Sequence, residues 1–300
     1  MPTISSPLET VSEVTVHQNA TALTTPQKAR RRALVIPREH GAWGMLLIPL
    51  VTGAAIGLFE GGKLTPVLLL LLAVLALFWL RTPAESWLGT NGMRAQTKEE
   101  RRAVCAFILP LASIAGISLG VLLWRDKMGY LLWIGVIAGC TFGVQMLLKR
   151  LGRATRMAAE IVGAFALTST APAAYCASTG RLDSRAGILW LVNWLFAANQ
   201  VHFVWLTIRG MRAARLNEKL SIGWSFLVAQ ILLGTALALI YQFGFLPQLA
   251  LLAFAPVLFR GFLWFIRKPV PLIVRRLGWS EFAHAVVFGV LMIWGFYFSS

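Results

Sequence analysis

The chain has 300 residues, of which 57% are hydrophobic and only 13% are charged, and its formal net charge is +16. Because about a quarter of the residues of a soluble domain are charged, this composition excludes an ordinary water-soluble protein. The basic residues lie in short segments between long apolar runs and form no basic face with stacking aromatic residues, so we expect no nucleic-acid partner. The three cysteines are isolated within apolar runs, and their spacing predicts neither a metal site nor a redox pair.

Residues 1–33 are rich in Ser, Thr and Ala and show no apolar periodicity. We therefore predict a disordered cytoplasmic tail. We expect no cleavable signal peptide, because no apolar core follows a basic start. The remaining residues, 34–300, are predicted to form a single transmembrane helical domain.

Apolar runs of about twenty residues follow one another along this domain, and each is long enough to cross a lipid bilayer as a helix. Only helices and closed barrels satisfy their backbone groups in lipid, so these runs predict an all-α polytopic membrane bundle. The nine predicted spans are 39–59, 64–82, 103–124, 129–148, 157–178, 186–208, 221–241, 244–264 and 280–298.

The positions of Lys and Arg predict the orientation of this bundle. With the N-terminus in the cytoplasm, all but five of the 28 Lys and Arg residues fall in cytoplasmic segments. Basic residues concentrate on the cytoplasmic side of membrane proteins, so we predict a cytoplasmic N-terminus and a C-terminus outside. The five exceptions are Lys63, Arg125, Lys127, Arg181 and Arg185.

Glycines four residues apart recur in three of the spans. Rows of small residues let two helices approach closely in lipid, so they predict structural contacts between helices. The rows are Gly53 with Gly57, Gly116 with Gly120, and Gly135 with Gly139 and Gly143.

The first span begins in a dense polar motif, Pro-Arg-Glu-His-Gly-Ala-Trp, at residues 37–43. The proline suits the first turn of a helix, and Glu39 falls in that turn, where the helix dipole favours a negative charge. Glu39, His40 and Trp43 lie on the same side of such a helix. Arg38 and Trp43 are also typical of anchors at a membrane interface. Two interpretations stay open, an interfacial anchor and part of a binding site.

This motif, followed by an apolar helix, resembles the YwiC-like family of bacterial membrane proteins. The resemblance covers the first helix and its approach. It implies a multi-pass protein of the bacterial plasma membrane and carries no particular reaction.

The sixth span is polar for a membrane helix. Its residues Asn199, His202 and Arg209 share one face, while Asn193 and Gln200 share another. Polar side chains within a span usually face the bundle interior or a wet cavity, because exposure to lipid is costly. They form interhelical hydrogen bonds or they belong to a site, and the sequence leaves both open.

Nine spans with enlarged cytoplasmic loops after the second and the sixth resemble the UbiA-type intramembrane prenyltransferases. In that family, Asp-rich motifs at these two loops bind magnesium and the diphosphate of an isoprenoid. This chain has only Glu85 in the first loop, and Arg209, Arg212 and Arg215 stand in the second. Magnesium prefers oxygen ligands, usually carboxylates together with phosphates. We therefore expect no magnesium site and no other cofactor.

The leading hypothesis is a cytoplasm-facing cavity that binds an anionic-headed amphiphile, an isoprenyl diphosphate or a lipid, because arginine binds phosphate and carboxylate directly. Whether a prenyltransferase-like reaction follows stays open. The alternative is a non-catalytic transporter or membrane assembly factor, with the basic residues serving only orientation and anionic lipid headgroups. We expect Glu39 to pair with Arg81 or Arg209 across the cavity. The candidate ligand-binding residues are Arg38, Glu39, His40, Trp43, Arg81, Glu85, Arg94, Asn199, His202, Arg209 and Arg212.

Overall fold

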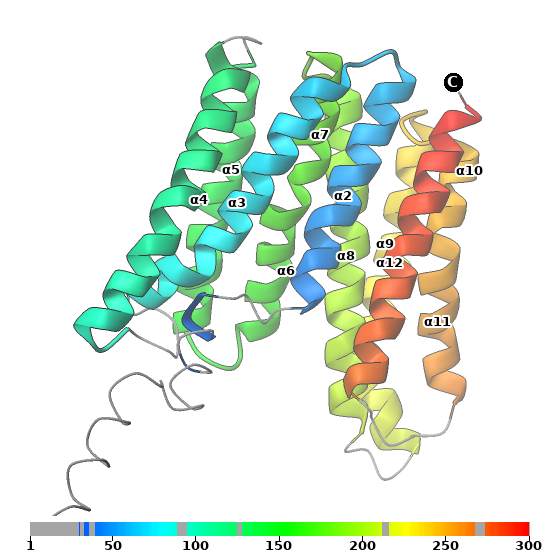
Figure 1. Ribbon diagram of the computed structural model, residues 1–300. Coiled ribbons are helices and arrows are strands. Elements are labelled where there is room, and N and C mark those ends of the chain that lie inside the picture. The colour runs from blue at the N-terminus through cyan, green and yellow to red at the C-terminus, as the bar shows by residue number, and fades with distance from the viewer. Residues whose placement is uncertain are drawn as a thin grey trace, which may run out of the picture. The chain divides into compact units, whose positions relative to one another are not determined.

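The structure, a computed structural model, is built almost entirely of helices, and the residues that it describes contain no strand (Figure 1). It describes residues 30, 33–35, 40–88, 95–124, 128–211, 216–267 and 274–299. Most of the predicted tail lies outside these ranges, but Arg30 and residues 33–35 are helical. The elements are α2 (His40–Phe59), α3 (Leu64–Leu88), α4 (Lys98–Trp124), α5 (Tyr130–Arg150), α6 (Arg156–Thr168), α7 (Thr170–Thr179), α8 (Ser184–Gly210), α9 (Leu216–Gln242), α10 (Gln248–Leu251), η1 (Leu252–Phe254), α11 (Ala255–Ile266) and α12 (Val274–Tyr297).

Within the described part of the chain, nine helical segments are long and apolar enough to cross a membrane, which confirms the predicted all-α bundle of nine spans. Two spans are interrupted. The fifth passes from α6 to α7 at Ser169, and the eighth passes from α10 through the 3-10 turn η1 to α11. A proline lies just after each break, and neither Pro172 nor Pro256 has an N–H to bond the carbonyl four residues before it.

The chain divides into two compact units. Unit 1 consists of Met1–Arg38 and Leu77–Ala112, and unit 2 consists of Glu39–Ala76 and Ser113–Ser300. Helices α3 and α4 each contribute residues to both units.

Unit 1 is held together by polar contacts and a small apolar cluster. Arg30 Nε donates to Glu100 Oε1 at 2.7 Å. The Ser86 hydroxyl donates to the backbone oxygen of Leu34 at 3.1 Å. These contacts tie Arg30 to the start of α4 and Leu34 to the end of α3. The apolar cluster consists of Leu34, Val35, Ala95 and Val104.

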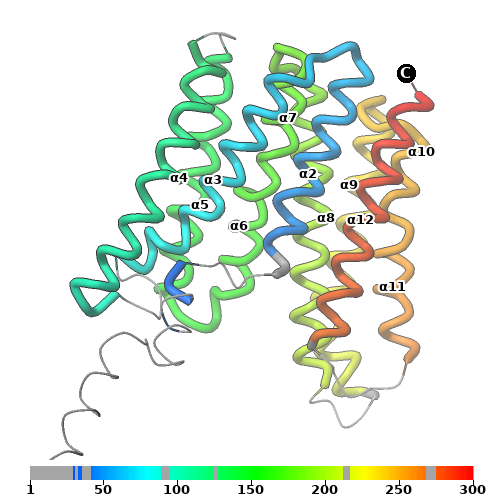
Figure 2. The backbone as a smooth tube through the Cα atoms, in the orientation of Figure 1, coloured from blue at the N-terminus to red at the C-terminus, as the bar shows by residue number. Residues whose placement is uncertain are grey.

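Unit 2 carries the main core. Helix α2 packs against α7 and α12, and α8 packs against α6, α7 and α9, as the tube in Figure 2 lets the reader follow. Helix α11 contacts α8, α9 and α12. Tyr175, Phe254 and Phe288 are among its largest fully buried side chains, so the core runs from α7 across to α12.

The predicted glycine rows divide into two kinds. A Cβ on Gly53 would lie 2.0 Å from the backbone oxygen of Ala171, and one on Gly57 would lie 2.9 Å from Ser178 Cβ. The close contact expected of this row is therefore confirmed, between α2 and α7. At the rows in α4 and α5, an added Cβ would meet no described atom within 4 Å.

Candidate functional site

Two charged side chains pair inside the bundle of unit 2. Arg260 of α11 donates from Nη1 to Glu281 Oε1 of α12, and the two side chains are only 12% and 14% exposed. At 1.5 Å per residue, Arg260 lies about 9 Å from the Ile266 end of α11, and Glu281 lies about 10 Å into α12. An ionisable pair at such a depth in a membrane bundle is a candidate functional site.

Helix α8 supplies polar and aromatic contacts to this pair. The side-chain amide of Gln200 donates to the backbone oxygen of Glu281 at 2.8 Å. The guanidinium carbon of Arg260 lies 3.9 Å from the centre of the Phe203 ring, which places the cation against its π face. Helices α11 and α12, which carry the two charges, thus both contact α8.

Two further amides lie in the same layer. The rings of Phe203 in α8 and Phe226 in α9 are 5.9 Å apart, so these residues are level with each other. Because α8 and α9 are antiparallel neighbours, Asn199 and Gln230, each one turn away, share the next level. A Cβ on Gly261 would lie 3.5 Å from Gln230 Cδ, which brings Gln230 against α11 beside Arg260. We call Asn199, Gln200, Gln230, Arg260 and Glu281 the inner polar cluster.

The inner polar cluster is rich in unsatisfied groups. Seven buried side-chain polar atoms of the described residues have no hydrogen-bond partner within the protein, and six of them belong to this cluster. Burying a polar group without a partner costs about 1–3 kcal/mol. So many such atoms in one layer indicate a place where polar groups from outside the chain bind. The six are Asn199 Oδ1, Gln230 Nε2 and Oε1, Arg260 Nε and Nη2, and Glu281 Oε2.

The unsatisfied nitrogens of Arg260 have a defined geometry. Nη1 is engaged by Glu281, whereas Nε and Nη2 form the other edge of the planar guanidinium. Their N–H groups point in parallel, as a fork that fits the two oxygens of a carboxylate or phosphate. The open edge of Arg260 is therefore a ready oxyanion-binding group.

An aromatic layer closes one side of the cluster. Phe196, one turn from Gln200, stacks on Phe288 with ring centres 3.9 Å apart. Phe254 lies edge-on to Phe288 at 5.2 Å. These buried rings lie between the cluster and the opposite ends of the helices.

The polar motif at residues 37–43 leads into α2 beside this site. A Cβ on Gly44 would lie 3.7 Å from Phe282, the residue after Glu281, so the beginning of α2 packs beside the charged pair. Trp43 is half-buried. Arg38 and Glu39 lie outside the described residues, and only the backbone of His40 is described. The pairing expected of Glu39 therefore stays a prediction.

The other candidate residues are dispersed. In unit 1, Arg81 Nε donates to Glu85 Oε1 at 2.9 Å, one helical turn away. Arg94 and Arg212 lie outside the described residues. Arg209, at the end of α8, is exposed, and its guanidinium lies 5.2 Å from the Trp205 ring.

The polar face of α8 reaches different surroundings along its length. His202 Nε2 and Ser225 Oγ of α9 are 3.4 Å apart, and Asn199 is buried. The interhelical hydrogen bonding left open for Asn193 and Gln200 is observed. The Thr52 hydroxyl of α2 lies 3.4 Å from Asn193 Oδ1, and Gln200 donates to the backbone of α12. Of the α8 candidates, Asn199 alone belongs to the inner polar cluster.

Sequence reasoning did not single out Arg260: it counted this residue among the cytoplasmic basic residues, although the predicted eighth span, 244–264, includes it. The structure places it inside the eighth span, two turns before Arg267, which ends that span. The sequence does indicate that Arg260 lies within a span and not in a loop, because Phe259 and residues 261–266 continue the apolar run past it.

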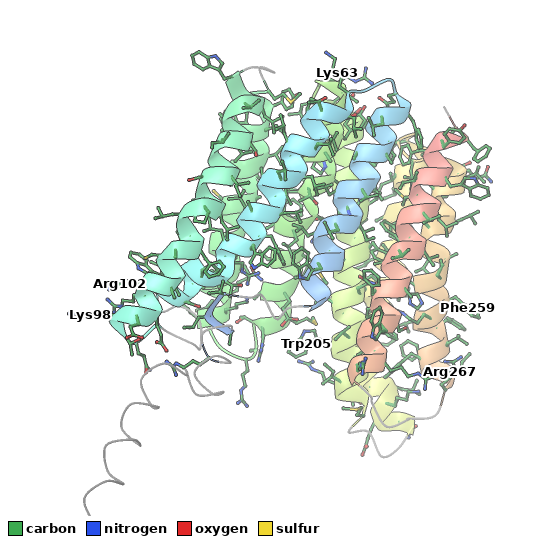
Figure 3. The ribbon with its side chains drawn as sticks, in the orientation of Figure 1. Lys63, Lys98, Arg102, Trp205, Phe259 and Arg267 are labelled. Atoms are coloured by element: carbon green, nitrogen blue, oxygen red, sulfur yellow. The ribbon has the colours of Figure 1, made fainter. Side chains whose placement is uncertain are left out.

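A second charged group, also missed, lies at the opposite end of unit 2, near Lys63 (Figure 3). Glu60, whose side chain is 12% exposed, accepts from the Tyr175 hydroxyl at 2.8 Å and from Arg181 Nη2 at 2.5 Å. It also accepts from Arg185 Nη1, and Arg181 Nε pairs with Asp183 at 3.1 Å. We call these five residues the Glu60 cluster. Its positive and negative charges balance, and it joins the ends of α2, α7 and α8.

The electrostatics of the Glu60 cluster favour its charged forms. Burial acts to raise the pKa of Glu60, but hydrogen bonds from Arg185 and Tyr175 and the charge of Arg185 outweigh it, so the pKa lies below its ordinary value. The pKa of Arg181 is raised, first by its hydrogen bond to Tyr175 and then by Glu60. The cluster is a fully satisfied structural junction, in contrast to the inner polar cluster.

The sequence model of the YwiC-like protein family matches residues 36–175 of this chain. A protein of Bacillus subtilis (strain 168), described as uncharacterized protein YwiC, is 27% identical over 259 residues, which cover 86% of this chain and 96% of that protein. No solved structure matches the chain. The resemblance to this family is confirmed, whereas the likeness in layout to UbiA-type prenyltransferases stays a prediction.

Proposed function

We propose that this chain, which resembles the YwiC-like family, binds an anionic-headed amphiphile such as an isoprenyl diphosphate or an anionic lipid. Its described residues include nine helices long and apolar enough to span a membrane. The observation that carries the proposal is the open Nε–Nη2 edge of Arg260, a buried fork with no partner within the protein. The headgroup binds this edge, and Gln230 donates a further hydrogen bond to it from Nε2.

The surroundings of Arg260 fit the tail of an amphiphile. Phe259 and Phe262 of α11 are each 66% exposed, and Figure 3 shows Phe259 on the outer side of that helix. Exposed apolar side chains of a membrane helix contact lipid, so a ligand whose tail lies in the bilayer can bring its headgroup to α11 from the lipid phase. A water-soluble anion has no apolar tail, so these exposed apolar side chains would not contribute to its binding.

The aromatic layer favours a one-sided binding site over a transport path. A transporter places polar groups through both halves of the membrane, often beside broken helices. Here Phe196, Phe254 and Phe288 lie between the inner polar cluster and the Glu60 cluster. The break at η1 lies next to this layer, so a transporter stays the contrasting hypothesis.

We propose that the exposed Arg209, at the end of α8, meets the outer part of a diphosphate headgroup. Arg38, His40, Arg212, Arg81, Glu85 and Arg94 stay predicted candidates. No step of a prenyl transfer is assigned to any of these residues.

The test compares two conservative variants. Arg260→Lys keeps the charge but removes the two-pronged fork, whereas Arg276→Lys makes the same change at an exposed position of α12. We expect native mass spectrometry with geranyl diphosphate and with phosphatidic acid to show about tenfold weaker binding for Arg260→Lys and unchanged binding for Arg276→Lys. A chelator of magnesium should leave the binding of either probe unchanged.

Equal binding by the two variants would show that Arg260 holds no headgroup, and the proposal would then be wrong. A preference for one of the two probes identifies the class of amphiphile. Mass spectrometry of lipids and isoprenoids that copurify with the wild-type protein in mild detergent identifies the natural ligand.

A further inference from the structure

The inner polar cluster contains a negative charge beside the proposed anion site. Glu281 Oε1 holds Arg260 Nη1, while its other oxygen, Oε2, is buried and has no partner within the protein. As an ion pair, Arg260 and Glu281 are together neutral. A bound monoanion would leave this buried layer with a net charge of −1, and an uncompensated charge in a low-dielectric interior is strongly unfavourable.

A single proton removes this penalty. A proton taken from water by Glu281 Oε2 makes the carboxyl group neutral, and the positive charge of Arg260 then balances the bound anion. The protonated oxygen also gains an O–H donor, which satisfies an atom that is otherwise unpartnered. Without ligand, Glu281 is thus the ion-pair partner of Arg260. With ligand bound, it becomes a hydrogen-bond donor beside the ligand.

We infer that the site binds an oxyanion together with one proton, and that Glu281 carries this proton. The inference rests on the proposed function, because it concerns the anion held by the open edge of Arg260. The inferred ligand therefore presents a single negative charge to Arg260, either as a monoanion or as one anionic group of a larger headgroup. It binds more tightly as the pH falls.

Other titratable groups on the helices that form the cluster are alternative sites for the proton. His202 of α8 lies beside Ser225 of α9. His284 of α12 has Nδ1 at 2.7 Å from the backbone oxygen of Ser280. Lys219 of α9 donates to the backbone oxygens of Trp264 and Arg267 at the end of α11. Among the titratable groups that the structure describes, Glu281 is the one that forms an ion pair with Arg260.

The test uses octanesulfonate, a tailed monoanion that does not titrate in the neutral range, with protein purified in an uncharged detergent. Isothermal titration calorimetry in two buffers of different ionisation enthalpy counts the protons taken up. We expect one proton per bound sulfonate and affinity that falls as the pH rises, by up to about tenfold per pH unit. This measurement needs only the wild-type protein, so it does not depend on the folding of a variant.

Two variants locate the proton. Glu281→Gln keeps the shape and a hydrogen-bond donor but has no charge, so it should bind octanesulfonate without proton uptake and with little pH dependence. His284→Asn, at a titratable residue outside the candidate ligand-binding set, should keep the wild-type proton uptake. Proton uptake that persists in Glu281→Gln, or that is lost in His284→Asn alone, would overturn the inference.

The outcomes also separate this inference from the proposed function. If octanesulfonate binds without proton uptake by the wild type, the proton inference is wrong while the anion site stands. If neither octanesulfonate nor the tail-free methanesulfonate binds, both proposals are wrong. If methanesulfonate binds as tightly as octanesulfonate, the ligand is a free anion and the amphiphile proposal is wrong, while the proton count still decides the role of Glu281.

Discussion

Glu60 shows how one carboxylate can organise the end of a membrane bundle. It lies directly after α2, yet its three hydrogen-bond donors come from Tyr175 in α7 and from Arg181 and Arg185 beyond it. Both arginines are about half exposed, so each ion pair alone is worth little. The buried carboxylate, with hydrogen bonds to both of its oxygens, is the stabilising part of the cluster.

At the residue scale, Glu60→Gln should lower the free energy of unfolding by about 1–2 kcal/mol at neutral pH, because charged hydrogen bonds are lost. The pKa of Glu60 lies below its ordinary value of 4.5, so the folded state binds the proton less well than the unfolded state. Its contribution is therefore fully present above about pH 4.5 and is lost as the pH falls through the folded-state pKa.

Thermal unfolding of the wild type and of Glu60→Gln at a series of pH values checks this. The difference between the two should be constant near neutrality and should shrink in acid. Asp183→Asn is a control, since it removes a carboxylate that pairs with Arg181 but not with Arg185. A difference that grows as the pH falls would contradict the lowered pKa of Glu60.

Sequence reasoning reached some of these residues and not others, for physical reasons. Polar residues of α8 were recognisable because they interrupt an apolar run, and Gln200 does bond to another helix, α12. Arg260 looked like a loop charge, since nothing local distinguishes a charge with a buried partner from one in water. Its partner, Glu281, is on another helix, and only tertiary packing brings them together.

At the scale of elements, α2 and α7 are in contact through backbone that only glycine allows. An added Cβ at Gly53 would lie 2.0 Å from the Ala171 oxygen, whereas one at Gly139 of α5 would meet no described atom within 4 Å. Gly53→Ala should therefore destabilise the protein by about 1–3 kcal/mol through overpacking. Gly139→Ala should be neutral or slightly stabilising, because alanine is the better helix former.

Unfolding of the two glycine variants in mixed detergent micelles compares them directly. Equal stability of Gly53→Ala and Gly139→Ala would show that α2 and α7 are not in backbone contact at Gly53. The existence of all nine spans followed from the apolar runs, whereas α3 continues six residues past the predicted end at 82 and α12 begins six residues before the predicted start at 280. The break at Ser169 was not predicted, because membrane helices tolerate proline and Pro172 stops this one only in its packed context.

At the scale of the whole molecule, the distribution of charge predicts a cytoplasmic N-terminus and a C-terminus outside. Single cysteines at positions 94 and 212 should then be protected from an impermeant thiol reagent in intact cells, and a cysteine at position 300 should react. The three native cysteines are first replaced by alanine. Labelling of position 94 from outside would reverse the predicted orientation.

The Glu60 cluster also imposes a sequence of events on the making of the protein. Arg181 and Arg185 follow Glu60 by 121 and 125 positions. At about 5–20 residues per second, a ribosome adds the two arginines roughly 6–25 seconds after the glutamate. During that interval the newly made α2 lacks both its ion pairs and the face of α7 on which Gly53 rests. The first span is thus made early but gains these contacts late, and a nascent chain that stalls before residue 170 leaves it without either.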